Sequence, residues 1–300
     1  IIYLDMKFLF VLVLVTFAML CRALKSPVTG RLARNTSLAP LSALATLERL
    51  ENNLTPKVVL DKIPQVFVYD HCPFCVRVRL ALGLKNIKHE VRYLANDDVA
   101  TPTGLVGKKI APIFAVEGKY DPTPESMDII DLVDSDPAFG PTKFFKPFSG
   151  RTDLKDWQKT VAASNRILQR PRYMLTTLPE FSQFDGKNAF VTNHQLAPYE
   201  KADWKANLSD DERWQLYDDA YTKSLTMIDE TNAALEKLDP LIYCEDYCTE
   251  GGLSYDDIDL WSRLRSMTLV KGVKFPTKLG KYMDNLSKLG DVPLYYSMAC

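Results

Sequence analysis

The sequence predicts an α/β domain followed by an all-helical domain, and two observations support this division. In the first half of the chain, short apolar runs alternate with one helical pattern, whereas in the second half apolar residues recur only at helical spacing. The chain has 300 residues, which is enough for two domains of ordinary size.

The α/β domain is expected between residues 63 and 137, where the apolar runs have the lengths of strands and helices. In chain order we expect a strand at 66–69, a helix at 72–85, a strand at 89–94, a hairpin formed by 113–116 and the region around Tyr120, and a helix at 126–133. A βαβ unit followed by a ββα unit is the arrangement of the thioredoxin fold. The first domain is therefore predicted to be thioredoxin-like.

A linker at 138–152 is expected to separate the two domains, because proline and glycine crowd it and no apolar period runs through it. Beyond the linker, residues 153–300 are predicted to form an all-α domain. The segment 181–207 is polar and aromatic without a period, and it receives no assignment.

Two capping boxes mark helix starts in the second domain. Ser209 precedes Glu212 by three residues, and Ser254 stands in the same relation to Asp257. After the first box, apolar residues recur over 214–238 at a spacing that predicts one continuous helical stripe.

The net charge is close to zero, with 37 Lys and Arg against 38 Asp and Glu. Because no basic excess is available to neutralise phosphates, nucleic acid is not expected as a partner. Six cysteines are too few for a disulfide scaffold in a chain of this length. The important thiols are therefore expected to serve chemistry rather than structure.

The N-terminus has the composition of a targeting leader. Lys7 precedes a largely apolar run at 8–20 that is too short to span a bilayer comfortably. With Ala23 as the cleavage site, residues 1–23 are predicted to be a secretory signal peptide, and translation is expected to begin at Met6.

Residues 24–62 are predicted to be a transit-like or disordered segment. Up to residue 47 this segment contains Lys, Arg, Ser and Thr but no Asp or Glu. A signal peptide followed by such a segment resembles the bipartite leader of proteins imported into algal plastids of secondary origin. We therefore predict such a plastid as the location, with the secretory pathway as the alternative. The mature form is expected to be a monomer without a membrane anchor.

Cys72 and Cys75 form the most informative motif of the chain, because they follow a predicted strand and open a predicted helix. A Cys-x-x-Cys motif at a helix start is typical of a redox site. The free N–H groups and the positive end of the helix dipole favour the thiolate of Cys72. Cys75 lies one turn further on and can attack a mixed disulfide formed on Cys72.

A pair of zinc ligands and an inert core position are the alternative interpretations of this motif. A four-thiolate zinc site needs a second close pair of cysteines. Cys244 and Cys248 lie far away in sequence with three residues between them, and we expect these two and Cys300 to be inert or partly exposed thiols. No metal site is predicted.

A peptide-binding edge is expected beside the cysteines. Ala111-Pro112 precedes an apolar strand at the place where a thioredoxin-type site has a cis-proline. The backbone of Ala111 would then be free to pair with an extended peptide. His71, next to Cys72, is either a proton donor or a half-exposed turn residue.

A head-group site is expected at the start of the last helix of the first domain. Ser126 and the neighbouring N–H groups can hold a carboxylate, and Glu125 can accept an ammonium group. Together they match the α-amino acid end of glutathione, although an ordinary helix cap is the alternative. Lys108 and Lys109 are candidates for the glycyl carboxylate of the same tripeptide, unless they are merely solvated loop lysines.

These motifs occur in the order found in a known family, the large bacterial glutaredoxins of the second type, which this chain resembles. The matching segments are 69–75, 83–87, 96–98, 101–103, 124–129, 269–270 with Gly272, and 297–299. The resemblance covers residues 66–300, with 181–207 atypical. It implies an α/β thioredoxin-like N-terminal domain and an all-α glutathione-transferase-like C-terminal domain.

The resemblance also implies an activity, namely the reduction of protein–glutathione mixed disulfides and protein disulfides with glutathione as co-substrate. Glutathionylated or disulfide-bonded proteins would be the partners. Cys72 resembles the nucleophile and Cys75 the resolving thiol. The positions that resemble glutathione contacts are Lys109, Ala111, Pro112, Glu125 and Ser126. Phe74 stands where the bacterial members usually have tyrosine, which removes a hydroxyl beside the site.

Other functions stay open at this point. A glutathione transferase would use glutathione itself as the nucleophile, and a prostaglandin-synthase-like relative would retain its apolar N-terminal anchor. A non-enzymatic protein, whose helical half serves as an adaptor or inserts into membranes like the glutathione-transferase-like chloride channels, would not need the second cysteine. An iron–sulfur cluster shared between two subunits is a further alternative, which the stiff turn at Pro73 opposes.

Overall fold

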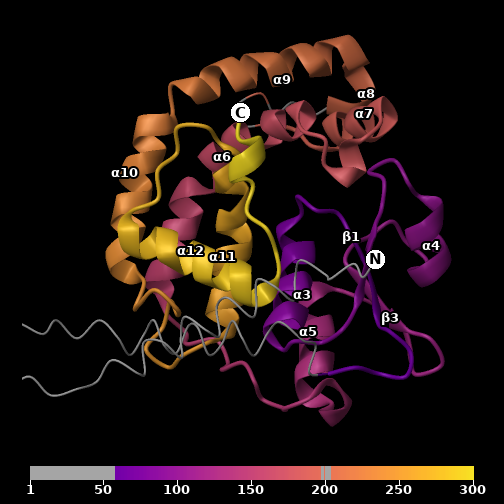
Figure 1. Ribbon diagram of the computed structural model, residues 1–300. Coiled ribbons are helices and arrows are strands. Elements are labelled where there is room, and N and C mark those ends of the chain that lie inside the picture. Colours follow the sequence, from indigo (N-terminus) through magenta and orange to yellow (C-terminus); the bar gives the residue numbers. More distant parts are fainter. Residues whose placement is uncertain (1–57, 197–198, 200–203) are drawn as a thin grey trace, which may run out of the picture. The chain divides into compact units, whose positions relative to one another are not determined.

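A computed structural model describes residues 58–196, 199 and 204–300 of the chain (Figure 1). The predicted signal peptide and most of the transit-like segment lie outside these residues, so the leader and the location derived from it stay predictions. In the described part of the chain, no helix is both long and apolar enough to cross a membrane.

A four-stranded sheet forms the centre of the N-terminal domain. Its strands are β1 (Gln65–Val68), β2 (Glu90–Tyr93), β3 (Ile113–Val116) and β4 (Tyr120–Pro124). β1 pairs with β2 in parallel and with β3 in antiparallel fashion, and β3 pairs with β4, which gives the order β2-β1-β3-β4. The predicted thioredoxin-like arrangement is confirmed.

The helices of this domain are α3 (Pro73–Leu84), α4 (Ala100–Val106) and α5 (Ser126–Ser135). Every second residue of β1 is buried, and Val66 and Val68 have no exposed surface, as expected for a strand with one face on the core. Helix α4 was not predicted, because it contains a proline and a glycine and buries only Pro102.

The C-terminal domain is helical, as predicted. Its helices are α6 (Thr152–Leu175), α7 (Phe184–Asn193), α8 (Trp204–Asn207), α9 (Asp210–Leu225), α10 (Ile228–Leu238), α11 (Tyr255–Leu264) and α12 (Thr277–Gly290). Single 3₁₀ turns lie at Pro137–Phe139, Pro179–Phe181, Asp239–Leu241, Arg265–Leu269 and Tyr296–Met298. Both predicted capping boxes are present, at Ser209 and at Ser254.

The predicted continuous stripe over 214–238 is wrong, because the helix breaks between α9 and α10. The N–H groups of Thr226 and Met227 bond to carbonyls three residues earlier, at 3.1 Å each, which ends α9 in a tight turn. Leu225, one residue of the stripe, is 50% exposed. The two helices bury their apolar residues in different clusters, and a change of direction makes this possible.

The unassigned segment 181–207 contains α7 and the short α8. Phe190 and Val191 of α7 are buried in one cluster with Trp204. Because the two buried apolar side chains of α7 are adjacent, they leave no helical period in the sequence. Gly186 lets α7 approach the turn before it, since a Cβ there would lie 2.4 Å from the carbonyl oxygen of Glu180.

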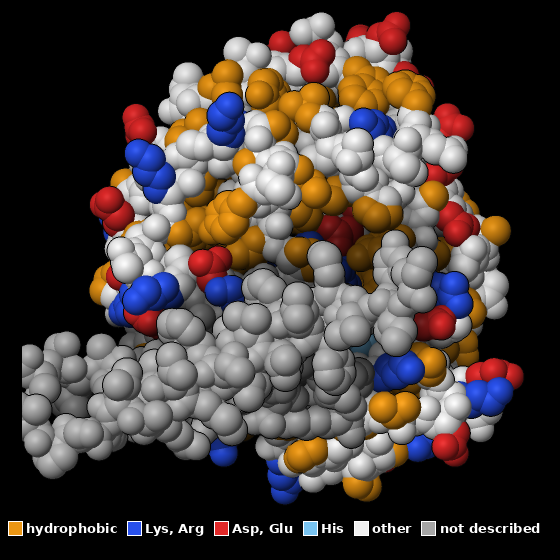
Figure 2. All heavy atoms as spheres, in the orientation of Figure 1, with side chains coloured by type: hydrophobic (Ala, Val, Ile, Leu, Met, Phe, Trp, Pro, Cys, Tyr) orange, Lys and Arg blue, Asp and Glu red, His pale blue; other side chains and the backbone are white. Residues whose placement is uncertain are grey.

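Charged side chains of both signs are interspersed on the face of the molecule drawn in Figure 2.

The two domains meet where α11 and α12 pack on α3, and Figure 1 shows these helices side by side. The closest approach is between Gly83 of α3 and Gly290 of α12. A Cβ at Gly83 would lie 1.8 Å from the carbonyl oxygen of Gly290. The absence of a side chain at Gly83 therefore fixes the spacing of the two domains.

Replacing Gly83 by alanine is expected to lower the free energy of unfolding by roughly 1–3 kcal/mol, because α3 and α12 have to move apart. Gly104→Ala is the matched control, since Gly104 is also helical and a Cβ there meets nothing within 4 Å. The control should be neutral or slightly stabilising. Denaturant unfolding of both variants tests this, and equal effects would contradict the assigned role of Gly83.

Candidate redox site

Cys72 lies at the junction between β1 and α3, at the position that caps the N-terminus of α3. Its backbone is extended (φ −73°, ψ 119°), and Pro73 occupies the first helical position, where a missing N–H breaks no hydrogen bond. Cys72 is half-buried, whereas Cys75 has no exposed surface. The local sequence thus places an accessible sulfur and an enclosed sulfur one helical turn apart.

The two thiols differ in acidity because their surroundings differ. A hydrogen bond from Cys75, the charge of His71 and the N–H groups of Cys75 and Phe74 outweigh burial and lower the pKa of Cys72 to about 6. Burial and the neighbouring Cys72 raise the pKa of Cys75 well above that of an ordinary thiol. At neutral pH the pair therefore holds a thiolate at Cys72 and a thiol at Cys75.

His71 is buried, so its interpretation as a half-exposed turn residue is wrong. Its backbone N–H donates to Glu180 Oε1 at 2.8 Å, and its ring Nδ1 lies 2.6 Å from the same oxygen. The rings of Tyr173, Phe181 and Phe190 surround the imidazole with centroid distances of 4.9–5.1 Å. The imidazole is thus held beside Cys72 by a carboxylate that is itself fully buried.

Glu180 is a site residue that sequence reasoning missed. It lies 109 residues from His71, in the 3₁₀ turn before α7. No local pattern in the sequence indicates that Glu180 is a hydrogen-bond partner of His71, because a single glutamate after a proline is typical of an ordinary surface turn. Glu180 reaches the site because its turn is hydrogen-bonded to the N-terminal domain, through its side chain to His71 and through its backbone carbonyl to Asn96.

Ala111 and Pro112 immediately precede β3, and the peptide bond between them is cis, as predicted. In the antiparallel pairing of β1 with β3, Phe67 stands opposite Ile113. The residues before β3 therefore lie next to the end of β1 from which the chain continues to Cys72. This topology brings the predicted peptide-binding edge to the cysteines.

Glu125 and Ser126 lie at the start of α5, which begins at Ser126 as predicted. Glu125 occupies the capping position with an unusual backbone (φ 73°, ψ 120°), and Ser126 is the first helical residue. A non-glycine residue in that conformation costs about 1–3 kcal/mol, and such strain clusters at binding sites. Ser126 is buried, and its Oγ accepts a hydrogen bond from Arg77 of α3 at 3.4 Å. The head-group candidates are thus connected to the helix that carries the cysteines.

The two lysines have different environments. Lys108 forms an exposed ion pair with Glu125 at 3.6 Å. Lys109 Nζ donates to the backbone carbonyl of Asn96 at 2.5 Å, and the Asn96 N–H in turn donates to the carbonyl oxygen of Glu180. Lys109 is therefore oriented by the same turn that holds His71, whereas the partner of Lys108 among the described residues is Glu125.

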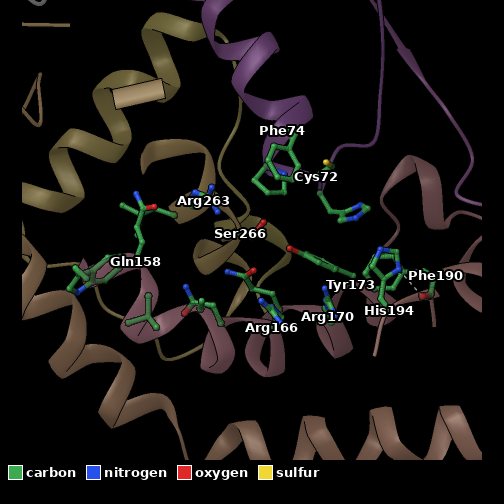
Figure 3. A pocket seen from close by; sticks show the side chains of 18 residues that line it. Cys72, Phe74, Gln158, Arg166, Arg170, Tyr173, Phe190, His194, Arg263 and Ser266 are labelled. Atoms are coloured by element: carbon green, nitrogen blue, oxygen red, sulfur yellow. Dashed lines mark hydrogen bonds between the residues drawn. The ribbon is translucent and has the colours of Figure 1, made fainter. Parts of the chain in front are cut away.

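A cavity of about 350 Å³ lies between the start of α3 and the C-terminal domain, and Cys72 is among the residues that line it. Figure 3 shows Cys72 and Phe74 at one wall and Gln158, Arg166 and Arg170 of α6 at the opposite wall. Its lining includes none of the predicted glutathione contacts. No local pattern in the sequence indicates this cavity.

The remaining cysteines show no comparable activation. All five cysteines in the described residues carry free thiols. Cys248 has no exposed surface, and burial together with the nearby Asp257 raises its pKa. Within the same described part, no group of three or more potential metal ligands is assembled.

A thioredoxin-like domain with Cys-x-x-Cys at its first helix, followed by a helical domain, defines the class of thioredoxin-fold proteins with glutathione-transferase architecture. Residues 66–141 match the family described as Glutathione S-transferase, N-terminal domain, and residues 153–299 match Glutaredoxin 2, C terminal domain. The Glutaredoxin 2 proteins of Escherichia coli strains K12 and O157:H7 are 34% identical to the chain over 239 residues. The match covers 78% of this chain and 99% of each relative.

A solved structure agrees with these matches. The crystal structure of glutaredoxin 2 from Salmonella typhimurium in complex with glutathione superposes with a TM-score of 0.68 at 32% sequence identity. It covers 80% of this chain and 100% of the Salmonella chain. The chain therefore belongs to the glutaredoxin 2 family.

The rate of Cys72 alkylation is expected to rise with pH through a midpoint of about 6, because only the thiolate reacts. At pH 7 about nine-tenths of the maximal rate should be reached, and at pH 5 about one-tenth. Timed alkylation with mass mapping measures Cys72 and Cys75 separately, and Cys75 should react slowly at every pH tested. A midpoint near that of a free thiol would contradict the assigned environment.

Removing the charge of His71 is expected to raise the pKa of Cys72 by roughly one unit, because that charge favours the thiolate. The variant combines His71→Asn with Glu180→Gln, so that no buried carboxylate loses its partner. His89→Asn is the control, since burial lowers the pKa of His89 and leaves that ring neutral. Thiolate absorbance against pH measures the shift. An unchanged pKa in the double variant would show that His71 does not activate Cys72.

Proposed function

We propose that this protein is a glutathione-dependent thiol–disulfide oxidoreductase that reduces mixed disulfides between proteins and glutathione, and protein disulfides. Membership of the glutaredoxin 2 family supports the class of reaction, and a relative has been crystallised with glutathione. The observation that carries the proposal is the pairing of a half-buried Cys72, whose pKa is lowered to about 6, with the enclosed thiol of Cys75.

In the first step, the Cys72 thiolate attacks the glutathione sulfur of a protein–glutathione mixed disulfide. A Cys72–glutathione disulfide forms, and the protein leaves as a thiolate that takes a proton from water. In the second step, a glutathione thiolate attacks the glutathione sulfur of that disulfide. Oxidised glutathione leaves and the Cys72 thiolate is restored, so that one half of the oxidised glutathione comes from the mixed disulfide and the other from one free glutathione.

Protein disulfides follow a second branch. The Cys72 thiolate first attacks a disulfide of the substrate protein, so that the protein S–S bond breaks, one protein thiolate leaves and a mixed disulfide with Cys72 forms. Cys75, once deprotonated, attacks Cys72 Sγ and releases the second protein thiol. The resulting Cys72–Cys75 disulfide is reduced by two molecules of glutathione. Because the pKa of Cys75 is raised, this branch needs a base to take its proton, and it is expected to be slower at neutral pH.

We place glutathione along the edge formed by the cis-proline and the start of α5. The γ-glutamyl head would lie at Glu125 and Ser126, the cysteinyl backbone at Ala111 beside Pro112, and the glycyl carboxylate near Lys109. The unusual backbone of Glu125 and the position of Ala111 just before β3 support this placement. Import into a plastid and removal of the leader stay predictions from composition.

Cys72→Ser is expected to lower the turnover of a glutathionylated peptide by more than about a hundredfold, because the nucleophile is lost. Cys75→Ser should keep most of that turnover and lose the reduction of protein disulfides. Formation of oxidised glutathione, coupled to its NADPH-dependent reductase, measures both. Persistence of peptide turnover in Cys72→Ser would refute the proposal. Conjugation of an aromatic chloro-electrophile by that same variant would favour a transferase.

A further inference from the structure

Cys75 is a reacting group whose proton cannot pass directly to solvent. The residue has no exposed surface, and its Sγ accepts a hydrogen bond from the backbone N–H of Tyr69 at 3.4 Å. In the branch that reduces protein disulfides, Cys75 has to lose its proton before it attacks Cys72 Sγ. Because bulk water does not reach the thiol, the acceptor of this proton has to be a group inside the protein.

Glu180 places a buried carboxylate near this thiol. Its side chain has no exposed surface, and Oε1 is bound by the backbone N–H of His71 at 2.8 Å and lies 2.6 Å from Nδ1 of the same residue. The N–H that binds Cys75 Sγ and the N–H that binds Oε1 belong to Tyr69 and His71, two residues apart in one loop. The two nitrogens are therefore at most about 7 Å apart. The sulfur and the carboxylate share one small enclosed region at the start of α3.

The second oxygen of this carboxylate is available for a proton. Oε2 of Glu180 is buried, and no hydrogen-bond donor among the described residues reaches it. A buried carboxylate oxygen without a donor costs free energy of folding, and redox or catalytic sites are places where such a group persists. Two contacts from His71 fix Oε1, whereas the lone pairs of Oε2 stay free.

The electrostatics of the two groups agree with this arrangement. Burial, then the neighbouring Cys72 and then the charge of Glu180 raise the pKa of Cys75. Once Cys72 is bound in a mixed disulfide, its thiolate no longer acts on Cys75, and burial and the carboxylate remain. Transfer of the proton to the carboxylate neutralises it while the Cys75 thiolate forms. The thiolate then does not develop beside a second anion.

Two groups close to Glu180 are poorer acceptors. The hydroxyl of Tyr69 is also buried, and it has no hydrogen-bond partner in the part of the chain that the structure describes. Burial, together with the charge of Cys75, raises the pKa of Tyr69, so the phenol stays protonated at neutral pH and cannot serve as a base. The imidazole of His71 is engaged with Glu180 through Nδ1, and its charge acts on the acidity of Cys72.

The other titratable groups around this carboxylate do not change charge near neutral pH. Burial raises the pKa of Tyr93 in β2 and that of Tyr173 in α6. Burial, reinforced by the charges of Arg170 and Lys109, lowers the pKa of His194 to about 4. These three side chains are neutral between pH 7 and pH 8. A pH dependence of thiol attack in that range therefore reports on the reacting thiol and its acceptor.

We propose that Glu180 is the proton acceptor for Cys75 in the branch that reduces protein disulfides. The inference rests on the function proposed above. When Cys75 attacks, its proton passes to Glu180 Oε2 over a hydrogen bond or through one bridging water. The bond between the Cys75 and Cys72 sulfurs forms, and the bond between Cys72 Sγ and the substrate sulfur breaks. The substrate leaves as a thiolate that takes a proton from water, and Glu180 releases its proton to water once the product has left.

A single turnover isolates this step. The Cys72 thiolate attacks a nitrothiobenzoate disulfide reagent, which releases one coloured nitrothiobenzoate and leaves a second one bound to Cys72. Attack by Cys75 then releases the second. Cys75→Ser lacks this second release and corrects for the other thiols of the chain. In the wild type, its rate is expected to change less than about threefold between pH 7 and pH 8, because the acceptor is an ionised carboxylate throughout.

In Glu180→Gln, the second release is expected to slow by about a hundredfold at pH 7 and to rise about tenfold per pH unit, because Cys75 must then lose its proton to hydroxide. Glu117→Gln is the matched control, with the same chemical change at a side chain that is 81% exposed between β3 and β4. Tyr69→Phe removes the competing phenol. Both controls should keep the wild-type rate and its weak pH dependence.

The outcomes separate this proposal from the proposed function. A wild-type rate that already rises tenfold per pH unit overturns the assignment of Glu180 without any variant. A folded Glu180→Gln variant with a weak pH dependence also overturns it, whatever the rate, and so does a steep dependence in Tyr69→Phe. In each case the turnover of glutathionylated peptides by Cys72, which does not need Cys75, leaves the oxidoreductase function standing. Failure of the wild type to turn over such a peptide overturns that function itself.

Discussion

The buried carboxylate of Asp70 ties the loop that carries Cys72 to both domains. It accepts hydrogen bonds from Arg79 of α3 and, from the C-terminal domain, from Arg265 at 3.2 Å and Tyr295 at 2.6 Å. Arg265 also donates to the backbone carbonyl of Asp70 at 2.7 Å. Burial by itself raises the pKa of Asp70, but the two guanidinium groups and the Tyr295 hydroxyl outweigh it and lower the pKa. The carboxylate is therefore charged at neutral pH.

This network fixes the position of the loop more than it raises the free energy of unfolding, because the desolvation of buried charges offsets most of their attraction. Removing one partner, however, leaves the others buried without a counter-charge and lowers the free energy of unfolding by about 3–5 kcal/mol. The loop between β1 and α3 therefore has one low-energy placement against the C-terminal domain. The next residue, His71, is held by Glu180 from the same domain. Cys72 follows directly, so the environment of its sulfur depends on two consecutive residues fixed from far along the chain.

The parts that the sequence predicted correctly are those with local causes. A strand that leads into Cys-Pro-x-Cys, a proline before an apolar strand, and serine capping boxes each follow from a few neighbouring residues. The contacts that it missed span long separations. Arg265 and Tyr295 lie 195 and 225 residues from Asp70, and Glu180 lies 109 residues from His71. The cavity could not be predicted for the same reason. Polar residues on one face of α6 are typical of a solvated helix surface, and only the fold places the N-terminal domain opposite them.

Arg77 connects the two sides of the site. Its guanidinium donates to Ser126 Oγ at 3.4 Å and to Asp259, and it lies 4.8 Å from the centre of the Phe74 ring. Asp259 in turn accepts from Arg263 at 3.0 Å. A single cluster of hydrogen bonds and ion pairs thus runs from the proposed head-group site of glutathione, past the exposed Phe74 of the motif, to Arg263, which lines the cavity. Because phenylalanine offers no hydroxyl there, Phe74 contributes only its ring to this cluster. The reactivity of Cys72 is set by the turn in which it lies.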